Sequence, residues 1–561
     1  MNTTQRMVYF ACVAISLVLI ASWLWPHSSA GTGLNLENVA SMPVSDDGRV
    51  KPLDTVARSS LLLLSGKQSV KVDGRRVEAI EWLLEVFARS QNAITMRVFR
   101  IDHPDVKAQL GLDDARNTFS YGELMPSVSE ISRQASLANQ ITPKKRDPYQ
   151  RQMLLLHRRL FVFNSLAALS KPYVVPPRSI GSGEWAPVTS AQGDTVTEQF
   201  KALIAGFQAR DHATLELTAA IWRAEIDSRQ PGLLSKASKE VWFNRARLFP
   251  LASGLYVLVF LYGSIGFIFS ESSGGWGLAL RRAATSVGLL ALVVHTVGLA
   301  MRIYLQGRPP VTNLYSSAVF IGWACVPIGM MMDKRTSVPL GLVASSVIAF
   351  ATLIVAHNLG GSGDTMQMMQ AVLDSNFWLA THVVVITIGY STTFLAGILG
   401  LAFVLLGVFT KRLEGAKGQA LGRSIYGVVC FATLLSFVGT VLGGIWADQS
   451  WGRFWGWDPK ENGAALIVVM NLIILHARWG GMIRQRGIAV LAIAGNIVTA
   501  WSWFGTNMLG VGLHSYGFTD SAVFWISVFI LSQLVMIGIG LLPMRLWRSG
   551  TMQRAVAAST A

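Results

Sequence analysis

Apolar residues form long uninterrupted runs along this chain, and most of these runs lie in its second half. A helix of about 20 apolar residues crosses the hydrocarbon core of a membrane, which is about 30 Å thick. One run lies near the start of the chain, from Met7 to Trp25. The others cover residues 248–270, 283–305, 315–332, 337–357, 377–408, 425–446, 462–477, 487–505 and 519–542. The pattern predicts an all-α polytopic membrane protein with about ten transmembrane helices.

The stretch between the first and second runs has a different composition. Residues 27–247 hold most of the carboxylates of the chain and no apolar run of spanning length. Helical periodicity at 79–89, 150–169 and 197–229, with Pro-rich connectors, predicts a mainly helical extracytoplasmic domain. The first run is followed by Trp-Pro-His rather than a small-residue cleavage site, so we expect a retained anchor. The expected parts are the anchor at 1–26, the soluble domain at 27–247, the polytopic domain at 248–545 and a tail at 546–561.

Basic residues predict the orientation of the helices. The formal net charge is +16, and with the N-terminus inside, most basic residues of the connecting loops fall on that same side. They are Arg281, Arg282, Lys334, Arg335, Lys411, Arg412, Lys417, Arg423, Arg478, Arg484, Arg486, Arg545, Arg548 and Arg554. The positive-inside rule predicts cytoplasmic termini, with the soluble domain and the segments 307–313, 358–378, 446–462 and 505–520 on the outer face. Because the charge records topology, we expect a lipid bilayer around the chain and no nucleic-acid partner.

The overall composition excludes an ordinary cytosolic enzyme. Hydrophobic residues make up 51% of the chain and charged residues 14%, whereas soluble domains carry roughly 25% charged residues. Cys12, Cys325 and Cys430 lie inside apolar runs without a C-x-x-C or zinc-ligand spacing. We therefore expect no disulfide framework and no thiol chemistry from this chain.

Tryptophans cluster in one predicted outer loop, residues 446–462. Four Trp and one Phe lie between Trp446 and Trp457, interleaved with glycines and followed by Asp, Lys and Glu. A belt of Trp at the membrane interface is the simpler interpretation. The density instead suits a flat apolar macrocycle, because indole rings stack on its plane while Arg453 or Lys460 can bind a carboxylate substituent.

Histidines supply the second chemical signal, because imidazole is the usual protein ligand of haem iron. His382 and His514 flank the Trp cluster in sequence and are expected at the same outer level, which suggests a bis-His haem site. Either one alone could equally be an interface His bonded to backbone carbonyls. His476 is expected near the cytoplasmic side, as a haem ligand or as a helix-end cap. His295 is expected at mid-membrane, as a functional group or as a partner of a neighbouring helix.

The run Trp451-Gly-x-x-Trp455-x-Trp457-Asp458-x-Lys460-Glu461 resembles the Trp-rich signature, called the WWD domain, of haem-handling membrane proteins. With His382 before it, and His476-Ala-Arg and Gly-Leu-His514-Ser-Tyr-Gly after it, residues 285–540 resemble the CcsA/ResC subunit of the system II cytochrome c synthase. The resemblance implies an outer haem b bound by His382 and His514. It implies a platform of Trp451, Trp455, Trp457 and Asp458. It also implies a haem site within the membrane at His476, for which His295 is the in-chain alternative partner.

The resemblance further implies a holocytochrome c synthase, or haem lyase, in a bacterial cytoplasmic membrane. Its substrates would be haem and apocytochrome c, its partner a separate CcsB/ResB-like subunit, and a thiol-reducing system would keep the substrate cysteines reduced. No nucleophile of this chain is required. Two other functions remain open, a haem or amphiphile exporter without ligation activity and a structural subunit of a respiratory complex.

The chain departs from the family pattern in two places. Tyr315 is followed by Ser316 where the family often has Glu. The N-terminal soluble domain exceeds the minimal family member, although the stretch 43–55, with Gly48-Arg49-Val-Lys51-Pro, resembles the openings of longer relatives. The resemblance implies no activity for that stretch.

Overall fold

The computed structural model describes residues 1–25, 35–181, 183–270, 275–336, 338–509 and 520–550. Contacts within the chain divide it into two compact units. Unit 1 comprises Met1–Trp25, Arg247–Leu359 and Met369–Ala561, and unit 2 comprises Pro26–Ala246 and Gly360–Met368. The short segment Gly360–Met368 therefore packs with the N-terminal half of the chain although it connects two helices of unit 1.

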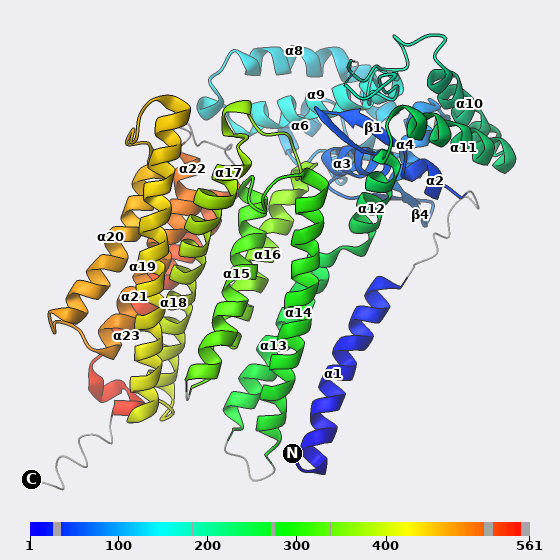
Figure 1. The fold of residues 1–561 in the computed structure, drawn as a ribbon. Coiled ribbons are helices and arrows are strands. Elements are labelled where there is room, and N and C mark those ends of the chain that lie inside the picture. The colour runs from blue at the N-terminus through cyan, green and yellow to red at the C-terminus, as the bar shows by residue number, and fades with distance from the viewer. Residues whose placement is uncertain (26–34, 182, 271–274, 337, 510–519, 551–561) are drawn as a thin grey trace, which may run out of the picture. The chain divides into compact units, whose positions relative to one another are not determined.

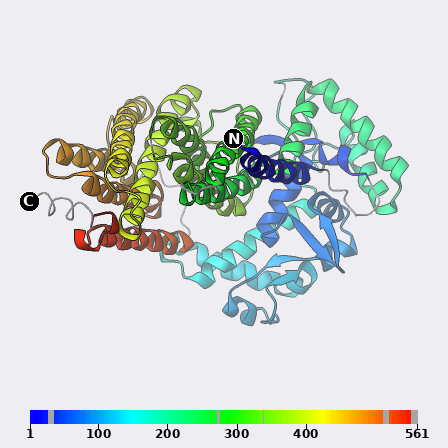
Figure 2. The ribbon, with the colours of Figure 1, turned by 90° about the horizontal axis from the view of Figure 1, so that it is seen from below.

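Ten helices in the described part of the chain are long and apolar enough to span a membrane. The helices that contain these spans are α1 (Thr3–Leu24), α13 (Leu248–Ile268), α14 (Trp276–Gln306), α15 (Leu314–Arg335), α16 (Gly341–Leu359), α18 (Val384–Phe409), α19 (Ala416–Trp451), α20 (Pro459–Trp479), α21 (Gln485–Ala500) and α23 (Asp520–Gly540). This confirms the predicted all-α polytopic membrane protein. Most of these helices run side by side along one direction (Figures 1 and 2).

Helix α18 has five spanning helices packed against it, which are α15, α16, α19, α21 and α23. Glycines allow the tightest of these contacts. A Cβ on Gly439 of α19 would lie 2.8 Å from the Cα of Ile386 in α18, so only glycine lets the two backbones come this close. The packing therefore fixes the position of the first turns of α18 against the end of α19.

Unit 2 is mainly helical and also holds three short antiparallel hairpins. The hairpins are β1–β2 (Pro43–Asp46, Arg49–Pro52), β3–β4 (Ser69–Val72, Arg75–Glu78) and β5–β6 (Arg97–Arg100, Thr118–Ser120). The helices are α2 (Glu37–Ala40), α3 (Leu53–Ser65), α4 (Ala79–Phe87), α5 (Gln91–Thr95), α6 (Pro104–Gln109), α7 (Tyr121–Leu124), α8 (Val128–Asn139), α9 (Pro148–Ala167), α10 (Thr195–Ala209), α11 (His212–Arg229) and α12 (Leu233–Ala246). Trp82, Phe99 and Trp222 are fully buried in its hydrophobic core.

Two details differ from the sequence expectation. The helical pattern at 197–229 forms two helices, because Arg210 adopts a left-handed conformation and Asp211 caps the next helix with its carboxylate. The loop in the Trp-rich stretch 446–462 is shorter than expected, because α19 continues to Trp451 and α20 begins at Pro459, which leaves residues 452–458 between them. Gly452, in the left-handed conformation, ends α19.

Candidate functional site

His382 lies at the start of α18, in a π-helical turn over Leu379–Val383 that follows the short helix α17 (Asn376–Trp378). Such turns are rare and are found frequently at functional sites. The His382 Nδ1 atom is 2.8 Å from the carbonyl oxygen of Gly439 in α19. Because a carbonyl only accepts, Nδ1 is the donor, and in the neutral ring Nε2 carries the lone pair. That is the tautomer in which an imidazole ligates a metal through Nε2.

A second glycine of α19 makes room for this imidazole. A Cβ on Gly443 would lie 2.6 Å from Cε1 and 3.0 Å from Nδ1 of His382. Real Cβ atoms do not approach other atoms so closely, so the ring occupies the space of the missing side chain. Gly439 accepts the hydrogen bond and Gly443 receives the ring, one helical turn apart on the same face of α19.

Tryptophans form a wall beside the imidazole. The Trp446 ring centroid is 5.7 Å from that of His382, and Trp446 stacks on Trp378 at 6.4 Å with an interplanar angle of 13°. The Trp378 indole nitrogen donates to Gln449 of α19 at 2.9 Å. These contacts fix the orientation of two indole rings next to the His382 imidazole.

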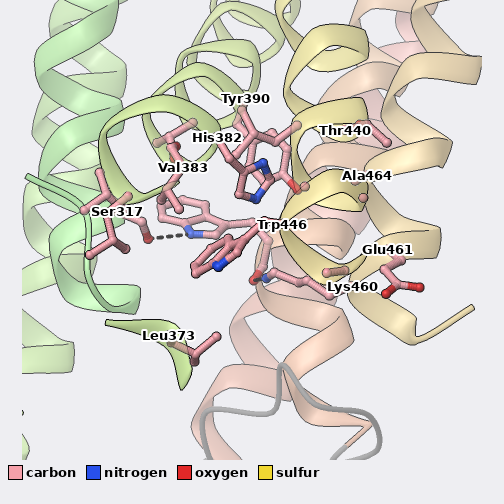
Figure 3. A pocket seen from close by; sticks show the side chains of 18 of the residues that line it. Ser317, Leu373, His382, Val383, Tyr390, Thr440, Trp446, Lys460, Glu461 and Ala464 are labelled. Atoms are coloured by element: carbon pink, nitrogen blue, oxygen red, sulfur yellow. Dashed lines mark hydrogen bonds between the residues drawn. The ribbon is translucent and has the colours of Figure 1, made fainter. Parts of the chain in front are cut away.

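Trp446 of this wall and the His382 imidazole line one cavity within unit 1. Its other lining residues come from α15, the stretch before α17, α18, the end of α19, the start of α20 and the turn at Trp503. Figure 3 shows His382, Tyr390 and Trp446 directed into this space, with Ser317 on the opposite side. Trp451 and Trp455 line it as well. Trp503 is held in place because its indole nitrogen donates to the Ser317 hydroxyl at 2.9 Å.

The turn between α19 and α20 is organised by a capping box. The Asp458 carboxylate accepts the backbone N–H groups of Lys460 and Glu461 at 2.8 and 2.9 Å. In return, Glu461 accepts the N–H groups of Gly456 and Asp458 at 2.7 and 3.2 Å. Asp458 is buried and does not line the cavity. Its position is that of a helix N-cap, which stabilises the start of α20.

Trp457 also stays outside the cavity lining. Its side chain is 75% exposed, and its backbone is in the left-handed region with φ of 57°. Its ring meets Trp455 edge-on at 6.1 Å between centroids. The structure therefore brings Trp451 and Trp455 together with His382 in one cavity and places Trp457 behind Trp455.

One cation lines the cavity, and one ion pair involves the residue that follows a lining residue in sequence. Lys460 lines the cavity, and its ammonium group donates to the carbonyl of Trp503 at 2.8 Å. Arg308 and Asp374 form a bidentate ion pair, with Nε to Oδ1 at 2.7 Å. The hydrogen bond from Arg308 lowers the pKa of Asp374, which therefore stays ionised at neutral pH. Asp374 directly follows the lining residue Leu373, so the pair restrains that wall.

The remaining predicted ligands lie elsewhere. His476 is near the far end of α20, about 25 Å along the axis from its start, and its Nδ1 is 2.9 Å from the carbonyl of Leu472. His295 is fully buried in α14, with Nδ1 3.1 Å from the Tyr256 hydroxyl and its ring against Phe249. His514 lies outside the described residues.

The sequence analysis missed several residues around His382, and it named Trp446 only as part of the Trp cluster. Gly439, Gly443 and Trp446 are spaced by four and three residues, which is the signature of one helical face. Likewise, Trp378 precedes His382 by one turn. Both spacings were available in the sequence. Trp503 carries no comparable signal, because it reaches the cavity through the docking of α21.

Comparisons with known proteins give an independent result. Residues 311–514 match the family model of cytochrome C assembly proteins. Protein NrfI of Wolinella succinogenes is 26% identical over 501 residues, which are 84% of this chain and 53% of that protein. Cytochrome c biogenesis protein CcsA of Prochlorococcus marinus (strain MIT 9303) is 28% identical over 301 residues, which are 48% of this chain and 93% of that protein. CcsA of Synechococcus sp. (strain CC9605) is 29% identical over 279 residues, which are 43% of this chain. This chain thus spans about half the length of NrfI and nearly all of the length of the CcsA proteins.

Proposed function

We propose that this chain, which carries a cytochrome c assembly domain of the CcsA type in residues 311–514, acts in cytochrome c biogenesis. It holds haem b and presents it for covalent attachment to the cysteines of an apocytochrome C-x-x-C-H segment. The observation that carries the proposal is the cavity in which His382, oriented by the carbonyl of Gly439, lies beside Trp446.

Each group of the cavity has a role in holding haem. His382 Nε2 ligates the iron, and His514, outside the described residues, is the proposed second ligand. The indole rings of Trp446, Trp451 and Trp455 contact the macrocycle plane. The Lys460 ammonium, already directed to the cavity by the carbonyl of Trp503, pairs with a haem carboxylate.

The chemistry of attachment requires positioning rather than a nucleophile from this chain. Each substrate thiol adds across one haem vinyl group, so that sulfur bonds to one vinyl carbon and the thiol hydrogen is transferred to the other. Atoms and electrons balance without an oxidant. Holding haem in a fixed orientation raises the effective concentration of the reacting groups. A separate reducing system keeps the substrate cysteines as thiols.

The proposed setting is a bacterial cytoplasmic membrane with both termini inside. The basic residues of the connecting segments support this orientation through the positive-inside rule. The end of unit 1 that carries His382 then lies on the outer face, where apocytochrome c is delivered. A separate CcsB/ResB-like subunit is the proposed membrane partner. His476, at the opposite end of α20, is the proposed ligand of a haem uptake site, with His295 as the in-chain alternative partner.

The test is to purify the full chain with its haem and record the absorption spectrum. We expect a low-spin bis-His spectrum in the wild type. We expect loss of most haem in His382→Ala and in His514→Ala, and recovery of the spectrum with added imidazole. If both alanine variants keep the wild-type haem content and spectrum, the two-ligand site is wrong.

Ligation needs a separate measurement. In a host without its own maturation system, the wild type with its partner subunit should yield cytochrome c with covalently bound haem. Normal haem binding and transport without any covalent product would instead identify a haem exporter.

A further inference from the structure

The stretch 43–55 of unit 2, which resembles the openings of longer relatives, holds a carboxylate from a distant part of the chain. Strands β1 and β2 pair so that Asp46 lies opposite Arg49. Arg49 Nη2 and Lys51 Nζ lie 2.9 and 3.2 Å from Oδ2 of Asp364. Asp364 belongs to the segment Gly360–Met368, which unit 2 includes although it follows α16 of unit 1.

Other residues of unit 2 also hold the two cations of this cluster, Arg49 and Lys51, in place. Arg49 forms a bidentate pair with Glu240 of α12, at 2.8 and 2.9 Å. The Thr55 hydroxyl donates to the same carboxylate at 2.8 Å, and Lys51 pairs with Asp46 at 2.8 Å. The Lys51 and Glu240 side chains are each 2% exposed. Removing one partner from a buried ion pair leaves an uncompensated charge, so such a cluster strongly favours one position of its carboxylate.

Met366 and Met368 of the segment Gly360–Met368 also support the position of Asp364. Asp364 Oδ1 accepts the backbone N–H of Met366 at 2.9 Å, and Met366 is buried. The Met368 Cγ would lie 3.3 Å from a Cβ on Gly48, whose φ of 78° places it in the left-handed region. Although burial raises the pKa of Asp364, the charges of Arg49 and Lys51 lower it to about 2, so the carboxylate is ionised at neutral pH.

The segment continues directly into the wall of the cavity. Met369, which follows it, and Leu373 both line the cavity that contains His382. Along the chain, Met369 and Leu373 therefore lie between two ion-paired carboxylates, Asp364 within unit 2 and Asp374 within unit 1.

We propose that Arg49 and Lys51 of unit 2 anchor Asp364 and thereby position the cavity wall at Met369 and Leu373 for haem binding. Unit 2 thus acts as a positioning element for the cavity, and Asp364 as a positioning residue rather than a ligand. The identity of the bound molecule rests on the proposed function. The anchoring of the wall does not.

Asp364→Asn tests the anchor in the full chain, because asparagine keeps the oxygen that accepts from Met366. It removes the charge and replaces Oδ2, which accepts from Arg49 and Lys51, with an N–H donor. Asp47→Asn is the matched control, since Asp47 lies in the turn of the same hairpin and pairs with Lys171 at the surface. We expect hydrogen exchange in residues 369–378 to rise at least about threefold in Asp364→Asn and to stay unchanged in Asp47→Asn. We expect retained haem to fall in the first variant alone. Unchanged exchange, or faster exchange with unchanged haem and spectrum, would overturn the proposal.

A covalent substitute for the ion pair separates positioning from general unfolding. The Met368 Cβ lies 4.0 Å from a Cβ on Gly48, within the range spanned by a disulfide. Adding Gly48→Cys and Met368→Cys to Asp364→Asn should return exchange and haem retention toward wild-type values when oxidised, and lose both on reduction. Failure of the oxidised form to restore either readout counts against the anchor. If the wild type binds no haem at all, the proposed function fails, and the exchange rates alone decide the anchor.

Discussion

The imidazole of His382 occupies the space where a side chain on Gly443 of the neighbouring helix would lie, with only 2.6 Å between Cε1 and the position of that Cβ. The same ring donates to the carbonyl of Gly439, one turn earlier on α19. The orientation of the proposed haem ligand therefore depends on two positions without side chains, Gly439 and Gly443, and on a backbone carbonyl.

A methyl group at position 443 should consequently displace the ligand. We expect Gly443→Ala to push the His382 ring off its hydrogen bond and to lower retained haem roughly tenfold, by analogy with other overpacked sites, which lose about 1–3 kcal/mol. Gly427→Ala in the same helix is the control, because a Cβ there meets nothing within 4 Å. The haem content and the absorption spectrum of the two purified variants test this expectation. Equal behaviour of the two variants would show that the close contact has no bearing on haem.

Lys460 should make the site prefer haem over a haem derivative that lacks free carboxylates. A charge-assisted hydrogen bond contributes about 1.5–3 kcal/mol, so Lys460→Met should weaken haem binding roughly ten- to hundredfold while keeping the aliphatic stem. The sharper measurement compares haem with its dimethyl ester, which lacks the charged groups. The wild type should prefer haem, and Lys460→Met should bind both ligands alike. A variant that still prefers haem would assign the carboxylate contact to another cation.

The membrane helices were predictable because a helix that crosses a bilayer needs about 20 consecutive, mainly apolar residues. The continuation of α19 through Trp451 was not, since the Trp-rich stretch was interpreted by its aromatic content rather than by helical spacing. His382 was predicted as a haem ligand from its residue type and from its expected position at the outer side of the membrane. Trp446 was named only as a member of the Trp cluster, and Gly443, whose missing side chain makes room for the imidazole, was detectable only from the helical face that the two residues share.

The anchor at Asp364 illustrates what sequence could not provide. Arg49 and Asp364 are separated by 315 positions, so no local periodicity or motif links them. The resemblance of the stretch 43–55 to longer relatives marked it without explaining it. The pairing of Arg49 and Lys51 with Asp364 becomes evident only in the fold, which brings this carboxylate to them from a distant part of the chain.

Asp458 should act through its capping bonds rather than through its charge. Asp458→Asn keeps a good N-cap residue and removes the charge, so we expect it to retain nearly all haem. Asp458→Ala removes the cap, costs about 1 kcal/mol, and should loosen the turn that carries Trp455. Haem content and thermal stability, measured for both variants, test this. Loss of haem in the asparagine variant without loss of stability would instead place the carboxylate on the haem.

Acid should release the anchor of the cavity wall. The folded-state pKa of Asp364 is about 2, below its ordinary value of 3.8. A lowered pKa means that ionised Asp364 stabilises the folded state above pH 4 and that this stabilisation disappears as the pH falls from about 4 to 2. The shift corresponds to about 2 kcal/mol. The groups that face the carboxylate are Arg49 and Lys51, with Asp46 and Glu240 behind them.

The measurement is cleavage within residues 360–378 by an acid-tolerant protease between pH 6 and pH 2, with Asp364→Asn at every pH as the reference. At pH 6 the wild type should be cleaved roughly ten- to thirtyfold more slowly than the variant, which is the rate equivalent of about 2 kcal/mol when cleavage follows the opened population. Because the asparagine carries no charge at any pH, the advantage of the wild type should vanish near pH 2. A ratio that stays constant across this range would mean that the charge of Asp364 does not hold the segment.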